Sequence, residues 1–521
     1  MGKSLARKID FLKNEKRNVL IILIVFPLLF FIVNNFSISK ITIDKYDFSV
    51  LAFTIKQALF STLLAFLLGI LPAIYISKNR NLLSKLLDST FIIPFYFPSS
   101  AAALVFSIMA LYIYEKTRID LFGGVTIIII AHAFYNSPII VKYVSGALKK
   151  IPQEIYELLK LEDISPFRKY LELLKSIKTD IIRALFLVFI FSFTSLSIII
   201  ALGKGKISTL ELEIIKTIET FDFSNTIKFI LMQAFIFGII HYFITRKNNI
   251  EFDISDMPKS HSSKNSIIEN VIAVAYLIFE YSPIIILFVT SISGFEKLFL
   301  DFRILNNEFK ILQSVGNSVF ISSISSVILV ILGYTFVKLK LERTALIPIY
   351  VSTAFWGISL VYLEIIFGLP EIIIAIIGFT IINLPLAYNF LASSVLDFKN
   401  EILEAARLDG ANKSRIFFSI ELPILKNIFF AVFFQIFAII FGEFTFSYIV
   451  NTSEFPLVSV VIFRMLSKRY ILESSAIGSI LLIFIIVFYF ISEQLLSKEK
   501  WNMVKYDRID FEIEMGWVWI I

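Results

Sequence analysis

The sequence predicts an all-α membrane protein with about twelve transmembrane helices, arranged as two parallel six-helix repeats. Of its 521 residues, 57% are hydrophobic and 17% are charged, whereas about a quarter of an ordinary soluble domain is charged. The mean hydropathy is +0.82. Apolar runs of roughly 18 to 25 residues recur along the chain, and a helix of that length crosses a hydrocarbon core about 30 Å thick.

The first half, residues 1–245, is predicted to hold six spans. Six Lys or Arg residues precede the first apolar run, and no small-residue cleavage pattern follows that run. We therefore expect an uncleaved span with a cytoplasmic N-terminus rather than a signal peptide. The predicted spans are 19–35, 51–77, 89–114, 122–147, 180–202 and 226–245.

A polar segment, residues 246–266, separates this half from the second half, residues 267–492. It combines Pro258 with a Ser, Lys and Asn cluster, which is typical of a linker. A C-terminal tail, 493–521, suggests no function beyond an interfacial aromatic contact. Basic residues gather at the span ends that share one side, so we expect a multi-pass protein of the cell membrane with both termini and the linker in the cytoplasm. The spans of the second half are predicted at 267–292, 313–337, 345–367, 371–395, 427–450 and 471–492.

An internal repeat relates the two halves. Asn136 precedes Glu157 by 21 residues, and Asn383 precedes Glu404 by the same interval. Both stretches leave the fourth span of their half for the cytoplasm, and an Ile-Pro pair stands near the start of each third span. The pattern indicates a duplicated six-helix unit.

The loop at 400–426 is long and polar, and its pattern is helical. We predict a first short helix from Glu401 to about Asp409, ended by Gly410 in a left-handed conformation. A second, amphipathic helix should follow and close at Pro423 before span eleven. The equivalent loop of the first half lies at 150–178. A helical hairpin with small residues on its surface is suited to docking on a partner.

This loop resembles the EAA motif of binding-protein-dependent ABC importer permeases. The fused two-half layout and the segments at 131–140 and 202–215 are similar to the ferric-iron and thiamine permeases of that superfamily. The residues that match the motif at its fixed spacing are Glu404, Ala405, Ala406, Gly410, Ile420, Leu422 and Pro423. In the first loop, Glu157 retains its place, but leucines follow it and Asp163 stands where the motif has glycine, so we expect a degenerate copy.

The resemblance implies the partners and the cofactor. Two copies of a cytoplasmic ABC ATPase would bind the two loops, an extracytoplasmic substrate-binding protein would deliver the solute, and the lipid bilayer would surround the spans. ATP would be bound by the partner subunits, so no cofactor is expected in this chain. The resemblance favours ferric iron as the substrate, with thiamine or another small solute as the alternative.

Other classes of protein are not favoured by the sequence. We find no phosphate-binding loop of the Gly-x4-Gly-Lys-Ser/Thr type, no HExxH, no nucleophile elbow and no pair of metal-ligand histidines, so neither an enzyme nor a metal site is predicted. No basic stretch interleaves aromatic residues, which argues against a nucleic-acid partner. The chain has no cysteine, which excludes disulfides.

A secondary active transporter of the major facilitator type remains the alternative. Such a carrier would use ionisable residues within its spans. Ordinary polar contacts inside the helix bundle would explain the same residues without a transport role. The candidates for a translocation path are His132, Asn136, Asn383 and Glu443, of which Glu443 is the first to test because an uncompensated carboxylate in a span is costly.

Overall fold

The computed structural model describes residues 2–36, 42–79, 81–152, 155, 158–159, 161, 165–245, 267–396, 400–450 and 454–518. Within these ranges every regular element is helical, which confirms the predicted all-α class. The elements of the first half are α1 (Gly2–Asn35), α2 (Lys45–Lys78), α3 (Leu82–Thr90), η2 (Ile93–Tyr96), α4 (Ser99–Thr117), α5 (Val125–Lys149), α7 (Pro166–Ser176), α8 (Lys178–Phe193), α9 (Ser197–Gly203), α10 (Leu210–Glu219) and α11 (Phe223–Thr245).

The second half repeats this order. Its elements are α12 (Ile267–Leu300), α13 (Phe302–Phe309), α14 (Ile311–Lys338), α15 (Glu342–Ala345), η3 (Ile347–Tyr350), α16 (Thr353–Phe367), α17 (Glu371–Leu396), α18 (Asn400–Leu408), α19 (Lys413–Ile416), η4 (Phe417–Glu421), α20 (Leu422–Gly442), α21 (Thr445–Val450), α22 (Val458–Ser467) and α23 (Ile471–Val518). The predicted boundary between the halves, 246–266, lies outside the described residues.

Eight described helices are long and apolar enough to cross a membrane, or up to ten if two bent pairs each count as one span. The bent pairs are α3–η2 with α4, at 94°, and α8 with α9, at 53°. The predicted spans 226–245 and 345–367 coincide with the shorter apolar helices of α11 and α16. The chain is therefore a multi-pass membrane protein, and the count of twelve spans stays a prediction.

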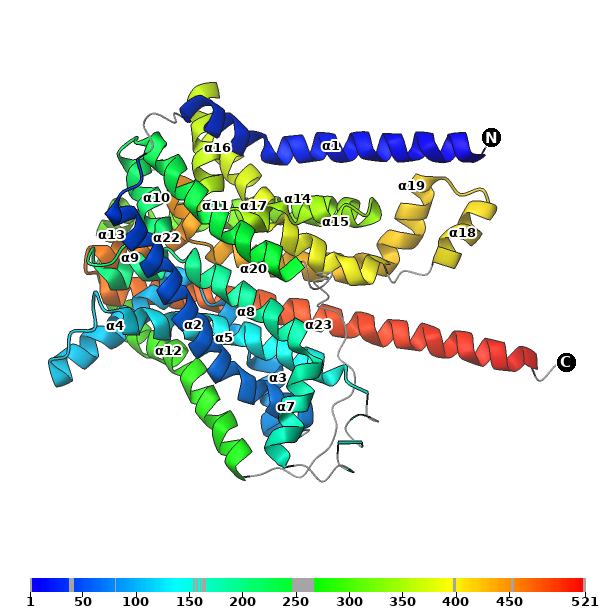
Figure 1. The fold of residues 1–521 in the computed structure, drawn as a ribbon, viewed down its shortest axis with the longest axis horizontal. Helices are drawn as coiled ribbons and strands as arrows, with labels where there is room; N and C mark the ends of the chain where they lie inside the picture. The colour runs from blue at the N-terminus through cyan, green and yellow to red at the C-terminus, as the bar shows by residue number, and fades with distance from the viewer. Residues whose placement is uncertain are drawn as a thin grey trace.

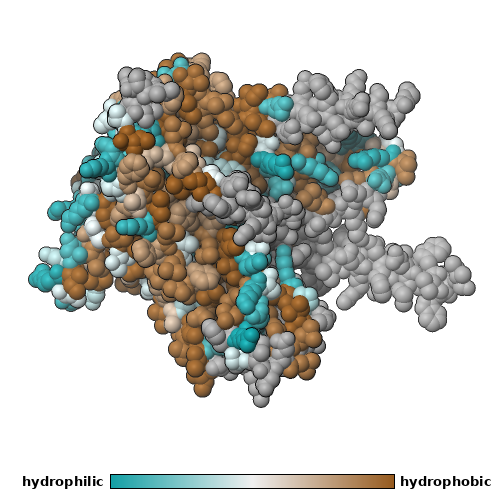
Figure 2. All heavy atoms as spheres, in the orientation of Figure 1, coloured by the Kyte–Doolittle hydropathy of each residue, from teal (hydrophilic) through white to brown (hydrophobic). Residues whose placement is uncertain are grey.

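The face of the helical body that Figure 2 shows is largely apolar where it is coloured, as the brown areas indicate. On α2, the side chains of Leu59, Leu63 and Leu67 follow one another at helical spacing, and each is more than half exposed. A stripe of leucines that faces outwards at this spacing is suited to contact with lipid tails.

Local structures recur between the halves. The two Ile-Pro pairs begin matching 3₁₀ turns, η2 and η3, with proline in the first turn. The N–H of Leu210 donates to Thr54 Oγ1 at 3.0 Å, and the N–H of Val458 donates to Ser318 Oγ at 3.0 Å. Both bonds join the first residue of a short helix, α10 or α22, to the second long helix of its half, which supports duplication of the unit.

The hydrophobic cores do not follow the division of the sequence. One core joins α2, α4 and α5 to α12, α22 and α23. The other joins α14, α16, α17 and α20 to α1, α10 and α11. Figure 1 shows α1 beside α16 at one side of the bundle and α12 below α2 and α4 at the other. Each core therefore contains helices from both halves.

The predicted second helix of the 400–426 loop differs from the structure at its C-terminal end. We expected Pro423 to close it, but α19, η4 and α20 run on as one helix, Lys413–Gly442. The segment before the proline is a π-helix, in which the N–H of Leu422 donates to the carbonyl of Phe417, five residues earlier. Proline removes one donor and crowds the preceding turn, and a widened π turn relieves this crowding without ending the helix.

Candidate functional site

A cavity of about 380 Å³ lies between the two cores. Its walls are formed by η2, α5, α8 and α9 from the first half and by η3, α17 and the α20–α21 corner from the second. On α5 and α17 the lining residues correspond, each pair being 247 residues apart in the sequence. These pairs are Tyr135 and Ile382, Asn136 and Asn383, Ile139 and Leu386, Lys142 and Asn389, and Tyr143 and Phe390.

All four residues named from the sequence as path candidates, His132, Asn136, Asn383 and Glu443, line this cavity. The structure thus brings together residues that are up to 311 positions apart in the chain. Their part in translocation stays a prediction, since lining a cavity is compatible with ordinary bundle contacts as well.

A buried polar network supports the α5 wall. His132 Nδ1 lies 3.3 Å from Ser61 Oγ of α2, and Asn136 Nδ2 donates to Ser192 Oγ of α8 at 3.1 Å. Gln57 of α2 donates to the carbonyl of Ser192 at 2.8 Å. Such hydrogen bonds between helices fix the rotation of α5 and so decide which of its side chains face the cavity.

Glu443 is held by the chain itself. Its carboxylate accepts hydrogen bonds from the N–H groups of Phe446, at 3.0 Å, and Ser447, at 3.1 Å, at the start of α21. Its carbonyl oxygen accepts from Ser447 Oγ and Ser459 Oγ, each at 2.7 Å. The carboxylate is therefore compensated by backbone donors, and the backbone carbonyl of Glu443 ties the corner of α20 and α21 to α22.

Lys142 also lines the cavity and was missed by the sequence reasoning. It lies near the end of the predicted span 122–147, where lysine side chains usually extend to the membrane surface. Its spacing in the sequence could have identified it. Residues three or four positions apart share a helix face, and Asn136, Ile139 and Lys142 are each three positions apart.

Beside the cavity, at the end of the bundle that carries α10, Glu211 joins three helices. Its side chain is 0% exposed; it accepts from Gln233 Nε2 of α11 at 3.0 Å and from the N–H of Ala354 of α16 at 3.3 Å. Burial of the carboxylate raises the pKa of Glu211 to about 7, against the lowering effect of the hydrogen bonds from Gln233 and Ala354. The start of α16, next to the cavity-lining Ser352 and Thr353, is thereby fixed to α10.

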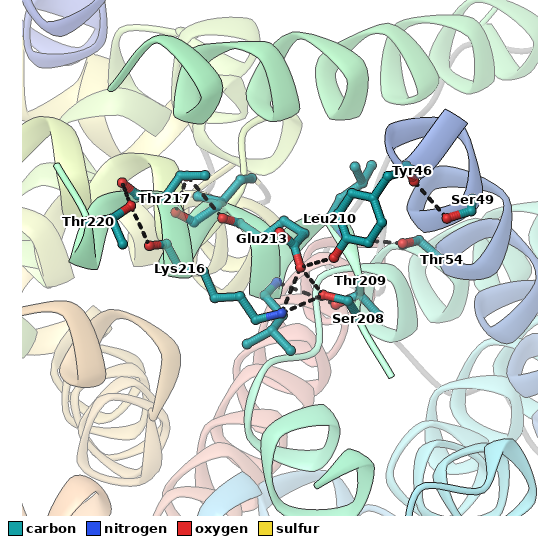
Figure 3. A network of polar contacts seen from close by, with 12 residues as sticks. Tyr46, Ser49, Thr54, Ser208, Thr209, Leu210, Glu213, Lys216, Thr217 and Thr220 are labelled. Atoms are coloured by element: carbon teal, nitrogen blue, oxygen red, sulfur yellow. Dashed lines mark hydrogen bonds and ion pairs between the residues drawn. The ribbon is translucent and has the colours of Figure 1, made fainter. Parts of the chain in front are cut away.

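A second network, drawn in Figure 3, positions the segment that precedes α10. The Glu213 carboxylate accepts from Tyr46 Oη of α2 at 2.8 Å and from Lys216 Nζ at 2.7 Å. Ser208 donates to the same carboxylate, and Lys216 also donates to Ser208 at 3.1 Å. The ion-paired carboxylate fastens residues 208–213 to the start of α2.

At the opposite end of the bundle, α18 and α19 form the helical hairpin expected from the sequence (Figure 1). Gly410 takes φ +82°, which is the left-handed conformation predicted for it. The N–H of Ala411 donates to the carbonyl of Ala406 at 3.0 Å, closing the end of α18. Glu404 and Ala405 are exposed, and Leu408 is 89% exposed.

The rest of the motif lies where the hairpin enters α20. Ile420 and Leu422 are half-buried, and Pro423 is exposed. Between them, the buried Glu421 accepts from Lys338 Nζ of α14 at 2.6 Å and from the Tyr334 hydroxyl. Glu421 was not singled out from the sequence, because its partners lie more than 80 residues away. The hairpin is therefore fastened to α14 as well as to α20.

The first loop is fastened differently. Tyr170 of α7 accepts from Lys78 Nζ of α2 at 2.9 Å, and the same ammonium group lies 2.7 Å from Glu269 of α12. This loop is thus linked to both halves. Glu157 and Asp163, the two residues predicted to correspond to the second loop's motif, lie outside the described residues.

Comparisons with known proteins agree with the resemblance found at 404–423. Residues 65–246 match the family described as binding-protein-dependent transport system inner membrane component. The thiamine transport system permease protein ThiP of Haemophilus influenzae is 25% identical over 288 residues, which is 49% of this chain and 50% of that protein. The match thus spans about half the length of this relative. The family match lies in the first half and the EAA residues in the second, so two separate parts of the chain resemble importer permeases.

Proposed function

We propose that this chain is the transmembrane subunit of an ATP-driven ABC importer. Its two cores would enclose the translocation path, and two copies of a cytoplasmic ABC ATPase would bind the loops at 150–178 and 400–426. An extracytoplasmic substrate-binding protein would deliver the solute, and ATP hydrolysis would take place on the partner subunits.

The observation that carries this proposal is the continuity from hairpin to cavity. The helix from Lys413 to Gly442 has 30 residues, so it is about 45 Å long at 1.5 Å per residue. One end emerges from the exposed hairpin that matches the EAA motif, and the other meets Glu443 at the cavity wall. A movement of a partner bound to the hairpin would therefore reach the cavity through one rigid element.

Other contacts would spread this movement. Glu421 binds Lys338 and Tyr334, so α14 would move with the hairpin. At the far end, the hydrogen bonds of Glu443 would carry the displacement to α21 and α22. Closure of the ATPase pair would thus rock one core against the other and open the cavity at the α10 end.

Thiamine is the first substrate to test, because the relative described above is a thiamine permease. Ferric iron, favoured by the sequence resemblance, is the second. In such systems the binding protein supplies most of the selectivity. Purification of the binding protein that associates with this chain, followed by identification of its ligand, decides between them.

The orientation proposed from the sequence places both termini in the cytoplasm. In Figure 1 the N-terminus and the C-terminus extend at the same end of the bundle as α18 and α19. If a cytoplasmic ATPase binds the hairpin, this end of the bundle lies on the cytoplasmic side of the membrane. The positive-inside rule favours the same orientation.

The test against a secondary carrier uses proteoliposomes. We expect uptake of thiamine or ferric iron only when the chain is reconstituted with its ATPase, its binding protein and ATP. Glu404→Lys should abolish this uptake, while Glu115→Lys, an exposed charge reversal on α4, should leave it unchanged. Uptake by the purified chain alone, driven by a proton or sodium gradient, would show that it is a secondary transporter instead.

A further inference from the structure

The charges that line the cavity are few and unequal. Among the described residues, three ionisable side chains apart from tyrosines reach its wall: His132, Lys142 and Glu443. Glu443 is occupied by the N–H groups of α21. The ammonium group of Lys142, by contrast, makes no hydrogen bond or ion pair with any residue that the structure describes, whereas the backbone carbonyl of Lys142 accepts from Ser145 Oγ at 3.4 Å.

The two charged groups lie at different levels of the cavity. Glu443 directly follows α20 (Leu422–Gly442), at the end of that helix distant from the hairpin, and Lys142 lies in the last third of α5 (Val125–Lys149). Since α5 runs towards the end of the bundle that carries α18 (Figure 1), Lys142, near the C-terminal end of α5, is expected nearer to that end than Glu443.

The second half does not repeat this lysine. The corresponding position on α17 is Asn389, which lines the opposite wall of the same cavity. The second half therefore has an uncharged amide at the position where the first half has an ammonium group. A lysine within a span is costly unless it is paired or faces water, so its presence on one wall alone points to a ligand.

We propose that Lys142 binds an anionic group, a carboxylate or a phosphate, on the transported solute. The inference rests on the proposed function and narrows its substrate class: it favours an anionic solute or complex over free thiamine and free ferric ion, which are both cations. The aromatic side chains of Tyr143 and Phe390, beside Lys142 and Asn389 on the two walls, would pack against the remainder of the solute. Because apolar walls lower the local dielectric, the ammonium group favours an anion there and disfavours a solute with only positive charge.

The absence of cysteine from the chain permits a direct test of the cavity's charge. Asn389→Cys places one thiol in the same cavity as Lys142, on the wall that the second half contributes. Two methanethiosulfonate reagents of similar size, one carrying a sulfonate and one a trimethylammonium group, are compared by their rates of reaction with this thiol in the purified chain. Their ratio cancels the intrinsic reactivity of the thiolate, and division by the same ratio for a small thiol in solution removes the difference between the reagents, so the result reports the electrostatic preference of the cavity.

We expect the sulfonate reagent to be favoured. Lys142→Asn, which introduces the residue type found at the corresponding position of the second half, should lower the ratio of the sulfonate rate to the trimethylammonium rate by about tenfold. Lys142→Arg should preserve the ratio because it keeps the charge, and Lys85→Asn, an exposed lysine of α3 outside the cavity, should also preserve it. An unchanged ratio in Lys142→Asn would overturn the proposal, and so would a thiol that neither reagent reaches.

Protection experiments distinguish the two anionic groups. Phenyl phosphate, benzoate and benzylammonium share a ring and differ in charge. When Lys142 is present, we expect phenyl phosphate or benzoate, but not benzylammonium, to slow modification of the thiol. Whichever of the two anions protects the thiol more strongly identifies the group, phosphate or carboxylate, that Lys142 prefers. Equal protection by benzylammonium would contradict the inference. None of these measurements needs the ATPase or the binding protein. A result that contradicts anion binding by Lys142 therefore does not bear on the importer proposal, which the proteoliposome assay tests separately.

Discussion

Gly410 provides a test of the hairpin that depends on backbone conformation alone. Its φ is +82°, and a Cβ atom added there would meet no other atom within 4 Å. Steric crowding is therefore excluded as a cause of any defect. A left-handed conformation costs an ordinary L-residue roughly 1–2 kcal/mol, which changes an equilibrium by about 5- to 30-fold.

This magnitude predicts a graded series. Gly410→Asn should remain within about twofold of the native activity, because asparagine tolerates the left-handed region. Gly410→Ala should lose about fivefold, and Gly410→Val more, since its β-branched side chain is the least tolerant of positive φ. Gly316→Ala on α14, where no atom lies within 4 Å and φ is not positive, is the matched control and should be neutral.

The assay is ATP hydrolysis by the complex of this chain with its ATPase and binding protein, normalised to the amount of inserted chain. The hairpin lies at one end of the bundle, so all four variants should insert to the same level. If Gly410→Val hydrolysed ATP like the native complex, the hairpin would be an ordinary connector. If Gly410→Asn were as harmful as Gly410→Val, the glycine would be required for close contact with a partner rather than for its φ.

Three further outcomes are expected. A cysteine in place of Asn412 should react with an impermeant thiol reagent in inverted vesicles and stay unlabelled in intact cells; labelling from outside would refute the topology. Because burial raises the pKa of Glu211 from 4.5 to about 7, the folded chain retains a proton that the unfolded chain has lost, so stability should fall as pH rises from about 4.5 to 7. Thermal unfolding of Glu211→Gln should lack that decline, and an unaltered pH dependence would assign it to another group. Gly294→Ala would place a Cβ against the backbone carbonyl of Leu472 on α23 and should cost about 1–3 kcal/mol, whereas the same change at Gly316 should not; equal unfolding midpoints would contradict the close packing of α12 on α23.

Much of the class and layout could be predicted from the sequence, because the relevant forces act locally along the chain. Long apolar runs must form helices in lipid, and the regular spacing from Glu404 to Pro423 identified the hairpin. Gly410 was placed correctly in the left-handed region, since the need for glycine at a helix end is a property of a few adjacent residues. The error at Pro423 was also local: proline usually ends a helix, but a π turn accommodates it here.

The environment of each polar group was decided only by the tertiary structure. Glu443 looked like a bare charge in a span, yet the fold supplies backbone donors from α21. Glu211 finds the N–H of Ala354 across 143 positions of sequence, and Lys142 faces a cavity whose opposite wall begins more than 200 residues later. Hydropathy and helix propensity depend on a residue and its near neighbours, whereas partners, burial and charge balance depend on which helices meet. In this chain each core combines helices from both halves, so that pairing could not be inferred from the order of the spans.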